Sequence, residues 1–276
     1  MVGNVVKLSV RAPASTANLG PVFDCAAVAL DLWNELEITS GDGEPDRSHL
    51  GVRAFERIAP ADGLRFDFLD RIPRERGLGS SASVIALGLV AGAIVAGREP
   101  DPEALLAEGV ELEGHADNLA AALAGGVCLT WEGRIARVAD EVPAELIALV
   151  PETTVATAEA RSALPDEVPL ADAAFSAGRA ALLGTALATG SEELLAPALD
   201  DRLHEPYRAR TAPLLEAVRG ELPDGAIGAT ISGSGPTVIV WARKHHYDRT
   251  LAELSERFPD AEVLWLKVSK KGAGRA

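Results

Sequence analysis

The stretch that decides the fold is Arg76-Gly77-Leu78-Gly79-Ser80-Ser81-Ala82, a glycine-rich loop that runs directly into an apolar segment ending at Ala96. The segment from Ser80 to Ala96 is apolar on nearly every side and too long for a strand, so it predicts a buried helix. A loop of this kind at a helix start presents unpaired N–H groups and the positive end of the helix dipole, which together bind anions. Taken alone, the segment is equally explained as a turn with a serine cap.

The same loop matches two other nucleotide-binding patterns only in part. Residues 77–82 fit the GxGxxA form of a dinucleotide fingerprint, which keeps a dinucleotide-binding oxidoreductase as an alternative. That fingerprint follows a buried parallel strand, whereas residues 64–68 alternate between apolar and polar side chains. No lysine follows the last glycine, so the loop is not a Walker A motif.

A second group of polar residues lies in Glu111-Leu112-Glu113-Gly114-His115-Ala116-Asp117-Asn118. Magnesium sites in phosphoryl-transfer enzymes use one or two protein carboxylates together with phosphate oxygens. One carboxylate of this stretch would meet that need, although a solvated helix end capped by Asp117 explains the same residues.

Two further loops complete the set of candidate segments. Residues 230–237 form a Gly/Ser loop between two expected strands, with more permissive residues than a plain hairpin turn requires. Residues 11–24 place a polar, turn-forming segment directly after the first expected strand, with Asp24 at its end.

Around these loops, strand and helix patterns mix without a strict βαβ alternation, so we expect an α+β fold. A break at Val142-Pro143 divides the chain into expected domains at residues 1–142 and 143–276, and the basic, glycine-rich tail 269–276 is expected to fray. The expected helices are 80–96, one from about 102, one from about 117 to 124, 171–188, 192–199, 207–219 and 247–257; the expected strands are 6–11, 36–38, 64–68, 127–131, 135–138, 146–150, 226–231, 238–241 and 263–268.

Composition and charge exclude several classes of protein. The 276 residues are 47% hydrophobic and carry a net charge of −15, so nucleic acid is not an expected partner, although a small nucleotide can be held by local dipoles. No run of about 18 apolar residues occurs, so we expect no membrane span. Residues 1–10 lack the basic patch and long apolar core of a targeting segment, so a cytoplasmic location is expected.

The four candidate segments together resemble the GHMP kinases, and within that family the members that phosphorylate homoserine. Four motifs carry the resemblance, in the family's order: Pro-Ala-Ser-Thr-Ala-Asn-Leu-Gly-Pro-x-Phe-Asp at 13–24, Gly-Leu-Gly-Ser-Ser-Ala at 77–82, Glu-Gly-His-x-Asp-Asn at 113–118 and Ser-Gly-Ser-Gly-Pro-Thr at 232–237. The second and fourth are shared across the family, whereas the first and third point to homoserine. The resemblance spans about residues 5–268.

The resemblance implies two domains with ATP and substrate in the cleft between them. The N-terminal nucleotide-binding domain would resemble domain 2 of ribosomal protein S5, and the C-terminal GHMP domain would be a ferredoxin-like α/β sandwich. It also implies Mg²⁺-dependent transfer of the γ-phosphoryl group of ATP to the side-chain hydroxyl of L-homoserine, giving O-phospho-L-homoserine in threonine biosynthesis, and it suggests a homodimer.

The resemblance also assigns roles to individual residues. ATP would be bound by Pro73, Arg74, Arg76, Gly77, Leu78, Gly79, Ser80, Ser81 and Ala82, and Mg²⁺ by Ser81 and Glu113. Substrate would be bound by Asn18, Asp24, His115, Arg161, Arg208 and Gly233, with Asn18, Asn118 and Thr157 as catalytic residues.

Physical chemistry supports this division of roles. A zwitterionic amino acid needs an anion for its ammonium group and guanidinium groups for its carboxylate, which Asp24 and the two arginines supply. Asn118 stands where some family members carry an aspartate base, and an amide cannot accept a proton. The resemblance therefore implies catalysis by positioning and charge stabilisation, without a dedicated side-chain base.

Three departures from the family's pattern leave the adenine contacts open. Glu75 replaces a glycine before the loop, Ala116 replaces a proline, and His49 stands near where an asparagine often contacts the nucleotide. Two further alternatives remain: a kinase of the mevalonate type, whose substrate offers no ammonium group to Asp24, and a nucleotide-binding regulatory protein without activity. Retention of Glu113 and both loop serines argues against the second.

Overall fold

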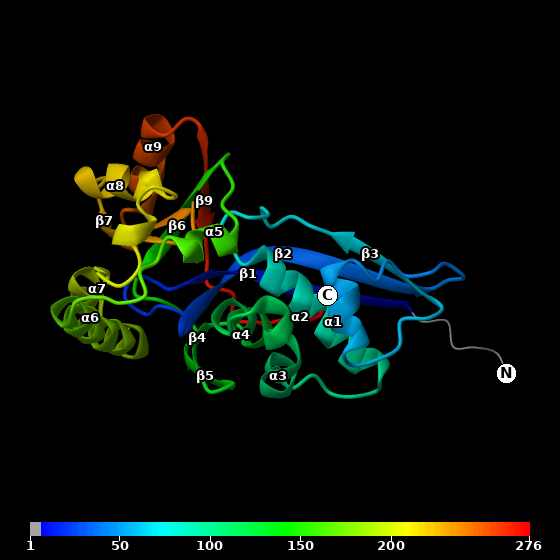
Figure 1. Cartoon of the computed structure of the whole chain (residues 1–276). Helices are drawn as coiled ribbons and strands as arrows, with labels where there is room; N and C mark the ends of the chain where they lie inside the picture. The colour runs from blue at the N-terminus through cyan, green and yellow to red at the C-terminus, as the bar shows by residue number, and fades with distance from the viewer. Residues whose placement is uncertain (1–6) are drawn as a thin grey trace.

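Two antiparallel sheets organise the chain in the computed structural model, which describes residues 7–276 (Figure 1). Every strand pair in this range is antiparallel, which is incompatible with the parallel sheet of the alternative dinucleotide-binding fold. Position 6 of the first expected strand lies outside the described residues, as does most of the segment expected to lack a targeting signal.

The first sheet carries four helices on one face (Figure 1). Its strands are β1 (Lys7–Ala17), β2 (Ala26–Ser40), β3 (Leu64–Leu69), β4 (Val127–Trp131), β5 (Arg134–Ala139) and the C-terminal β10 (Gly274–Arg275). The helices are α1 (Leu50–Glu56), α2 (Ser80–Val95), α3 (Pro102–Glu113) and α4 (Asp117–Ala124).

Helix α2 is buried on almost all sides because it lies against β1 and β2 and is flanked by the other three helices. Its glycines allow this close packing: a Cβ at Gly88 would lie 2.1 Å from the carbonyl oxygen of Gly51. The expected buried helix is therefore confirmed, and its first turn begins beside Ser15, near the end of β1.

The second sheet has the order β7-β8-β6-β9 and is covered on both faces. Its strands are β6 (Glu145–Pro151), β7 (Ala226–Ile231), β8 (Val238–Ala242) and β9 (Ala261–Leu266). Helices α8 (Pro213–Gly220) and α9 (Tyr247–Arg257) pack on one face, and α6 (Leu170–Thr189) and α7 (Glu192–Ala198) on the other. The short helices α5 (Thr157–Ser162) and η1 (Pro206–Arg208) lie in the connections.

The two sheets share one apolar core where the glycine loop meets the second sheet. This core includes Leu19 and Leu78 from the first half of the chain and Leu199 and Trp241 from the second. Hydrogen bonds join the halves at the same place, since the Gly233 N–H donates to the carbonyl of Ala17 at 3.1 Å. The loops that carry the candidate residues therefore converge.

Two expectations about secondary structure are wrong. The C-terminal tail does not fray: β10 pairs with β1, and the Ala273 N–H donates to the carbonyl of Ala122 at 2.7 Å. The expected helix 207–219 is divided into η1 and α8, because Pro213 has no N–H to continue a helix and instead opens α8.

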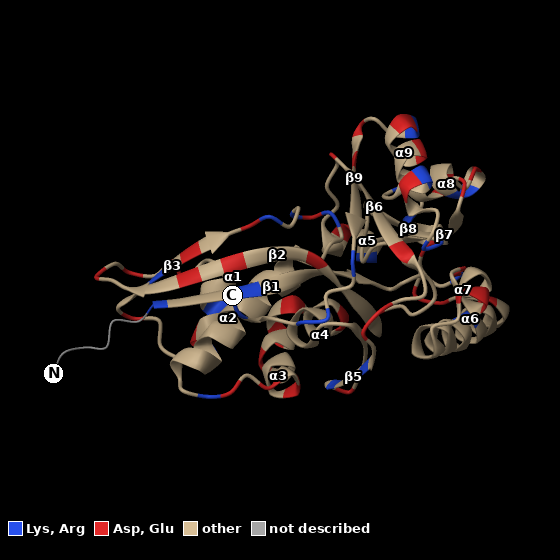
Figure 2. Ribbon diagram, turned by 180° about the vertical axis from the view of Figure 1, so that it is seen from behind, with Lys and Arg blue, Asp and Glu red and all other residues tan. Residues whose placement is uncertain are grey.

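Acidic side chains are spread over the molecule and are prominent on β2, β3 and α3 (Figure 2). Their distribution agrees with the general surplus of negative charge in the sequence. In the described range, no helix combines the length and the apolar character that a membrane crossing requires.

Candidate active site

A cavity of about 260 Å³ opens where the glycine loop and the start of α2 face the second half of the chain. Its walls come from four separate segments, which are residues 73–81, 113–118, 155–157 and 233–235. Helix α2 begins at this cavity with Gly79 as its N-cap, and no side chain caps its first turn. The free N–H groups and the helix dipole therefore suit an anionic ligand such as a phosphate.

Gly79 is required at this position by backbone geometry and space. Its φ is +65°, in the left-handed region, and a Cβ there would lie 2.1 Å from Ser15 Oγ. The loop is thus packed tightly against the end of β1, and its shape does not depend on a bound ligand.

Glu113 and Ser81 form the part of the cavity that fits a divalent cation. The Glu113 side chain is only 6% exposed, and Ser81 Oγ donates a hydrogen bond of 2.6 Å to its Oε2. Burial raises the pKa of this carboxyl group, because no cation compensates its charge fully. Since the described residues contain no cluster of three or more His, Cys, Asp or Glu suited to a metal, Mg²⁺ here would need phosphate oxygens as further ligands.

His115 and Asn118 lie on the same wall, at the start of α4. The His115 Nδ1 is 3.2 Å from Asp117 Oδ1; burial by itself would lower the pKa of this histidine, but the carboxylates of Asp117 and Glu113 outweigh it and raise the pKa. The Asn118 Oδ1 accepts a 2.8 Å hydrogen bond from Ser15 Oγ, which fixes the orientation of the amide.

Asp24 and Arg161 form an ion pair in which one nitrogen, Arg161 Nη2, lies 2.8 Å from both carboxylate oxygens. The side chains are 34% and 37% exposed, so the pair is open to solvent on one side. Asn18 fixes the backbone of Asp24, because its Oδ1 accepts a 2.9 Å hydrogen bond from the Asp24 N–H. Two residues expected to bind opposite charges of a substrate are therefore paired with each other.

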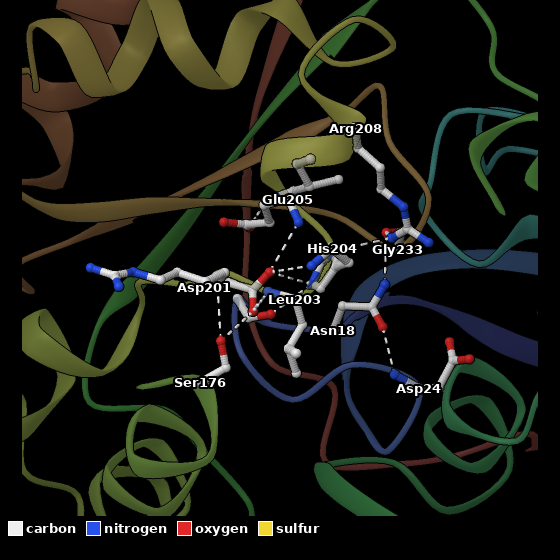
Figure 3. A network of polar contacts seen from close by, with 12 residues as sticks. Asn18, Asp24, Ser176, Asp201, Leu203, His204, Glu205, Arg208 and Gly233 are labelled. Atoms are coloured by element: carbon white, nitrogen blue, oxygen red, sulfur yellow. Dashed lines mark hydrogen bonds and ion pairs between the residues drawn. The ribbon is translucent and has the colours of Figure 1, made fainter. Parts of the chain in front are cut away.

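Arg208 is buried, and its charge interacts with those of Asp24 and Arg161; Figure 3 shows Arg208 together with Asn18, Asp24 and Gly233. Its Nη1 donates to the Gly233 carbonyl at 3.0 Å, and its guanidinium carbon lies 5.3 Å from the centre of the Phe23 ring. The Arg161 guanidinium carbon lies 5.8 Å from the same ring. The two arginines, 47 positions apart in the sequence, are thus brought to one aromatic side chain.

Of the remaining candidates on the substrate side, Asn18 joins two loops of the site and Thr157 lines the cavity. Asn18 Nδ2 donates to the Gly233 carbonyl at 2.8 Å, so its amide joins the turn 18–24 to the loop 232–235. Thr157 lines the cavity as the first residue of α5.

The expected ATP-binding residues are divided between two adjoining cavities and the core. Pro73, Arg76, Gly77, Gly79, Ser80 and Ser81 line the first cavity, and Arg76 Nη2 also donates to the Glu152 carbonyl at 2.9 Å. Arg74 pairs with Asp70 and lines a second cavity of about 400 Å³ that shares Ser80 and Ser81 with the first. The side chains of Leu78 and Ala82 are buried in the core.

The three departures from the family's pattern have structural roles here. His49 caps α1, since its Nδ1 accepts a 3.2 Å hydrogen bond from the Gly51 N–H, and its ring packs 4.0 Å from that of Phe68. Ala116 is the N-cap of α4. Glu75 has a φ of +55°, and its carbonyl accepts a 3.0 Å hydrogen bond from the Val155 N–H.

Sequence reasoning missed several residues that build the site. Ser232 Oγ donates to the Gly77 carbonyl at 2.7 Å and joins the two halves of the chain, and His204 contacts Arg208. Ser232 lies in the motif at 232–237 and His204 lies four residues before Arg208, but nothing in the local sequence indicates their distant partners.

Comparisons with known proteins agree with this geometry. Residues 49–126 match the GHMP kinases N terminal domain, and residues 176–260 match the GHMP kinases C terminal domain. The homoserine kinase of Streptomyces coelicolor is 42% identical over 269 residues, covering 88% of this chain and 87% of that protein. The homoserine kinase of Caldanaerobacter subterraneus is 36% identical and covers 99% of this chain and 96% of its own.

Solved structures show the same relationship. A homoserine kinase from Cytophaga hutchinsonii superimposes with a TM-score of 0.85 at 25% identity, covering 98% of this chain and 97% of that one. A mevalonate kinase structure has a TM-score of 0.71 at 14% identity over 96% of this chain and all of its own, which shows a shared fold alone. The chain belongs to the GHMP kinase family, and the expected α+β, two-domain fold of that family is confirmed.

Proposed function

We propose that this GHMP kinase transfers the γ-phosphoryl group of ATP to the side-chain hydroxyl of L-homoserine, giving O-phospho-L-homoserine for threonine biosynthesis. The observation that carries the proposal is a pair of opposite charges, Asp24 and Arg161, which hydrogen bonds of Asn18 connect to Gly233 in the wall of the cavity at the glycine loop. The curated relatives named homoserine kinase support the same substrate.

The charged residues match the two charges of an amino acid. The α-ammonium and α-carboxylate groups sit on one carbon, so an Asp–Arg pair in contact can exchange its internal ion pair for one contact with each group. Arg208 adds a second guanidinium beside Phe23. Mevalonate has no ammonium group and would leave Asp24 unpaired, so this geometry favours homoserine over the mevalonate-type alternative.

The phosphate side uses backbone more than side chains. The N–H groups of residues 77–81 and the start of α2 would hold the phosphates, and Ser81 with Glu113 would hold Mg²⁺. When bound, Mg²⁺ supplies charge neutralisation for the transferring phosphoryl group. The second cavity adjoins this site at Ser80 and Ser81, and we assign the nucleotide base to it.

The hydroxyl proton passes to an oxygen of the transferred phosphoryl group in this proposal, so no dedicated side-chain base is needed. Asn118 is fixed by Ser15 and cannot accept a proton, and Thr157 lies across the cavity as a neutral hydroxyl. The residues therefore act by orienting the acceptor hydroxyl and by stabilising charge in a loose transition state.

We also propose the partners, the cellular location, the assembly and the domain bounds of the enzyme. ATP and homoserine are the small-molecule partners, the enzyme acts in the cytoplasm, and a homodimer is the assembly that the family suggests. Residues 1–142 and 143–276 are assigned to the two domains, with the C-terminal strand β10 returning to the first sheet.

The proposal is tested by following phosphorus NMR signals of the purified chain with ATP, Mg²⁺ and either L-homoserine or mevalonate. We expect O-phosphohomoserine to accumulate, mevalonate to stay unmodified, and EDTA to stop the reaction. Phosphorylation of mevalonate with homoserine untouched would overturn the assignment.

A further inference from the structure

The turn that carries Arg208 is held by a buried carboxylate, Asp201 (Figure 3). The Asp201 Oδ2 accepts hydrogen bonds from the N–H groups of His204 and Glu205 at 2.8 and 2.9 Å, and Oδ1 accepts from the Leu203 N–H at 2.9 Å. Ser176 Oγ of α6 donates to the same Oδ1 at 3.0 Å. The backbone from 201 to 205 is therefore fixed before Arg208 is reached.

The partners of the His204 ring determine which of its nitrogens carries the proton. Nε2 lies 2.7 Å from the Gly20 carbonyl oxygen and 3.6 Å from Asp201 Oδ2, and both of these atoms are acceptors. Nδ1 lies 3.2 Å from Nη1 of Arg208, which can only donate. The proton is therefore on Nε2, and Nδ1 accepts a hydrogen bond from the arginine.

The ring is held neutral in this arrangement. The His204 side chain is 1% exposed, and burial lowers its pKa to about 4, against the opposing attraction of Asp201. A neutral ring keeps its Nδ1 lone pair available to Arg208 at the pH at which most enzymes work.

Arg208 is thereby fixed by one edge of its guanidinium group. Nη1 donates to both His204 Nδ1 and the Gly233 carbonyl, while Nε is buried and has no hydrogen-bond partner in the described part of the chain. Phe23 packs on both residues, since its ring centre lies 5.0 Å from that of His204. The protein holds Nη1, whereas no hydrogen bond within the described residues uses the Nε–Nη2 edge, of which Nε is buried.

We propose that His204 is a positioning residue, which orients the Arg208 guanidinium so that its free edge meets the carboxylate of the amino-acid substrate. The inference rests on the proposed function, which gives Arg208 that carboxylate. His204 does not touch substrate; it acts through Arg208 and, by its bond to Gly20, couples that arginine to the turn 18–24 that carries Asp24.

Two substitutions separate the two hydrogen bonds of the ring. In His204→Asn the amide oxygen reaches the place of Nδ1 and keeps an acceptor for Arg208, whereas in His204→Gln the amide nitrogen reaches the place of Nε2 and keeps only the bond to Gly20. Both substitutions remove the ring that stacks on Phe23, so the loss of this packing contact is common to the two variants. The exposed His245→Gln is the surface control.

We expect KM for homoserine to rise about tenfold in His204→Gln, as for the loss of one hydrogen bond to a charged group, and less than about threefold in His204→Asn. In both variants kcat and KM for ATP should stay within about twofold of wild type, because the phosphate end is unchanged. With L-homoserinol, which has no carboxylate, the difference between the two variants should disappear. Equal KM values for homoserine in the two variants, or a larger rise in His204→Asn, would overturn the proposal.

A measurement on the unmodified protein keeps the test independent of how the variants fold. Nitrogen NMR of the histidine rings should show His204 with a protonated Nε2 and an unprotonated Nδ1, and a protonated Nδ1 would contradict the proposal by itself. If the wild type does not phosphorylate homoserine, the proposed function fails. If it does so and His204→Gln keeps the wild-type KM, only the positioning role fails.

Discussion

The two ends of the proposed active site are built in different ways. The phosphate end consists of one continuous stretch, residues 77–81, whose backbone opens α2. The amino-acid end consists of side chains from separate segments, with Asp24, Arg161 and Arg208 brought to Phe23 by the fold. The first end depends on local backbone geometry, whereas the second depends on contacts between residues up to 215 positions apart, as for Asn18 and Gly233.

This difference determines how each end should respond to substitution. Backbone N–H groups cannot be removed by changing a side chain, so at the phosphate end the sensitive position is the buried carboxylate of Glu113. At the amino-acid end, Asp24 and Arg161 are paired with each other, so removing one leaves the other unpaired. Three predictions test this contrast, beginning with the largest effect.

Glu113→Gln should lower kcat by at least about a hundredfold, the scale of losing one preorganised electrostatic stabiliser, because the amide keeps the size but not the charge that fits Mg²⁺. Steady-state kinetics at saturating ATP and homoserine measure this, with circular dichroism to verify the fold. Glu111→Gln on the same helix is the matched control, because Glu111 is exposed and pairs with Arg57. Near wild-type turnover in Glu113→Gln would remove the carboxylate from the metal site.

Arg161→Ala should raise KM for homoserine about thirtyfold, which corresponds to about 2 kcal/mol of binding free energy. This value is at the lower end of the usual cost of removing one member of a charged pair, because solvent screens one side of the Asp24–Arg161 pair. The dissociation constant of ATP, measured without homoserine, should stay near wild type. L-Homoserinol should lose much less affinity than homoserine, and the exposed Arg210→Ala should behave as wild type. An equal loss for ATP and homoserine would show that Arg161 supports interdomain packing and not the amino-acid carboxylate.

The smallest effect concerns stability and pH at His204. Its pKa of about 4 in the folded chain lies below the usual 6.5 of an unfolded histidine, so its contribution is complete above about pH 6.5 and is lost as the pH falls towards 4. Between pH 7.5 and 5.5 the free energy of unfolding should therefore fall by about 1 kcal/mol more in wild type than in His204→Asn. Asp201, Arg208 and Asp24, the charged groups that act on the ring, are present in both proteins.

Urea unfolding at the two pH values measures this difference. Other titrating groups cancel in the comparison because the two proteins share them. The same pH dependence in both proteins would mean that His204 titrates as an ordinary exposed histidine, contrary to its burial.

The sequence-based predictions succeeded where local sequence determines the structure and failed where contacts between distant segments determine it. The helix expected at 80–96 is α2 at Ser80–Val95, because a long apolar segment between a glycine loop and Gly97 admits little else. Strand β2 was expected only at 36–38 but runs from Ala26 to Ser40. Its first part, residues 26–30, is wholly buried and consists of apolar residues only, so it shows no alternation.

The failed expectation for the tail has a tertiary cause. A basic, glycine-rich terminus is typical of a disordered end, yet these residues pair with β1 and pack against α4. A Cβ at Gly272 would lie 1.9 Å from the Leu123 carbonyl oxygen, so the glycine serves close packing here and not flexibility. Composition does not distinguish these two uses of glycine.

The sequence by itself determined the family, the anion-binding loop and the residue types that an amino-acid kinase needs, because these depend on neighbours along the chain. Only the tertiary structure decided that Asp24 pairs with Arg161, that Arg208 is buried with one free edge, and that His204 holds it. The physical reason is that a hydrogen bond between side chains depends on distance in space. Segments far apart in the sequence reach that distance only when the shared core of the two sheets has formed.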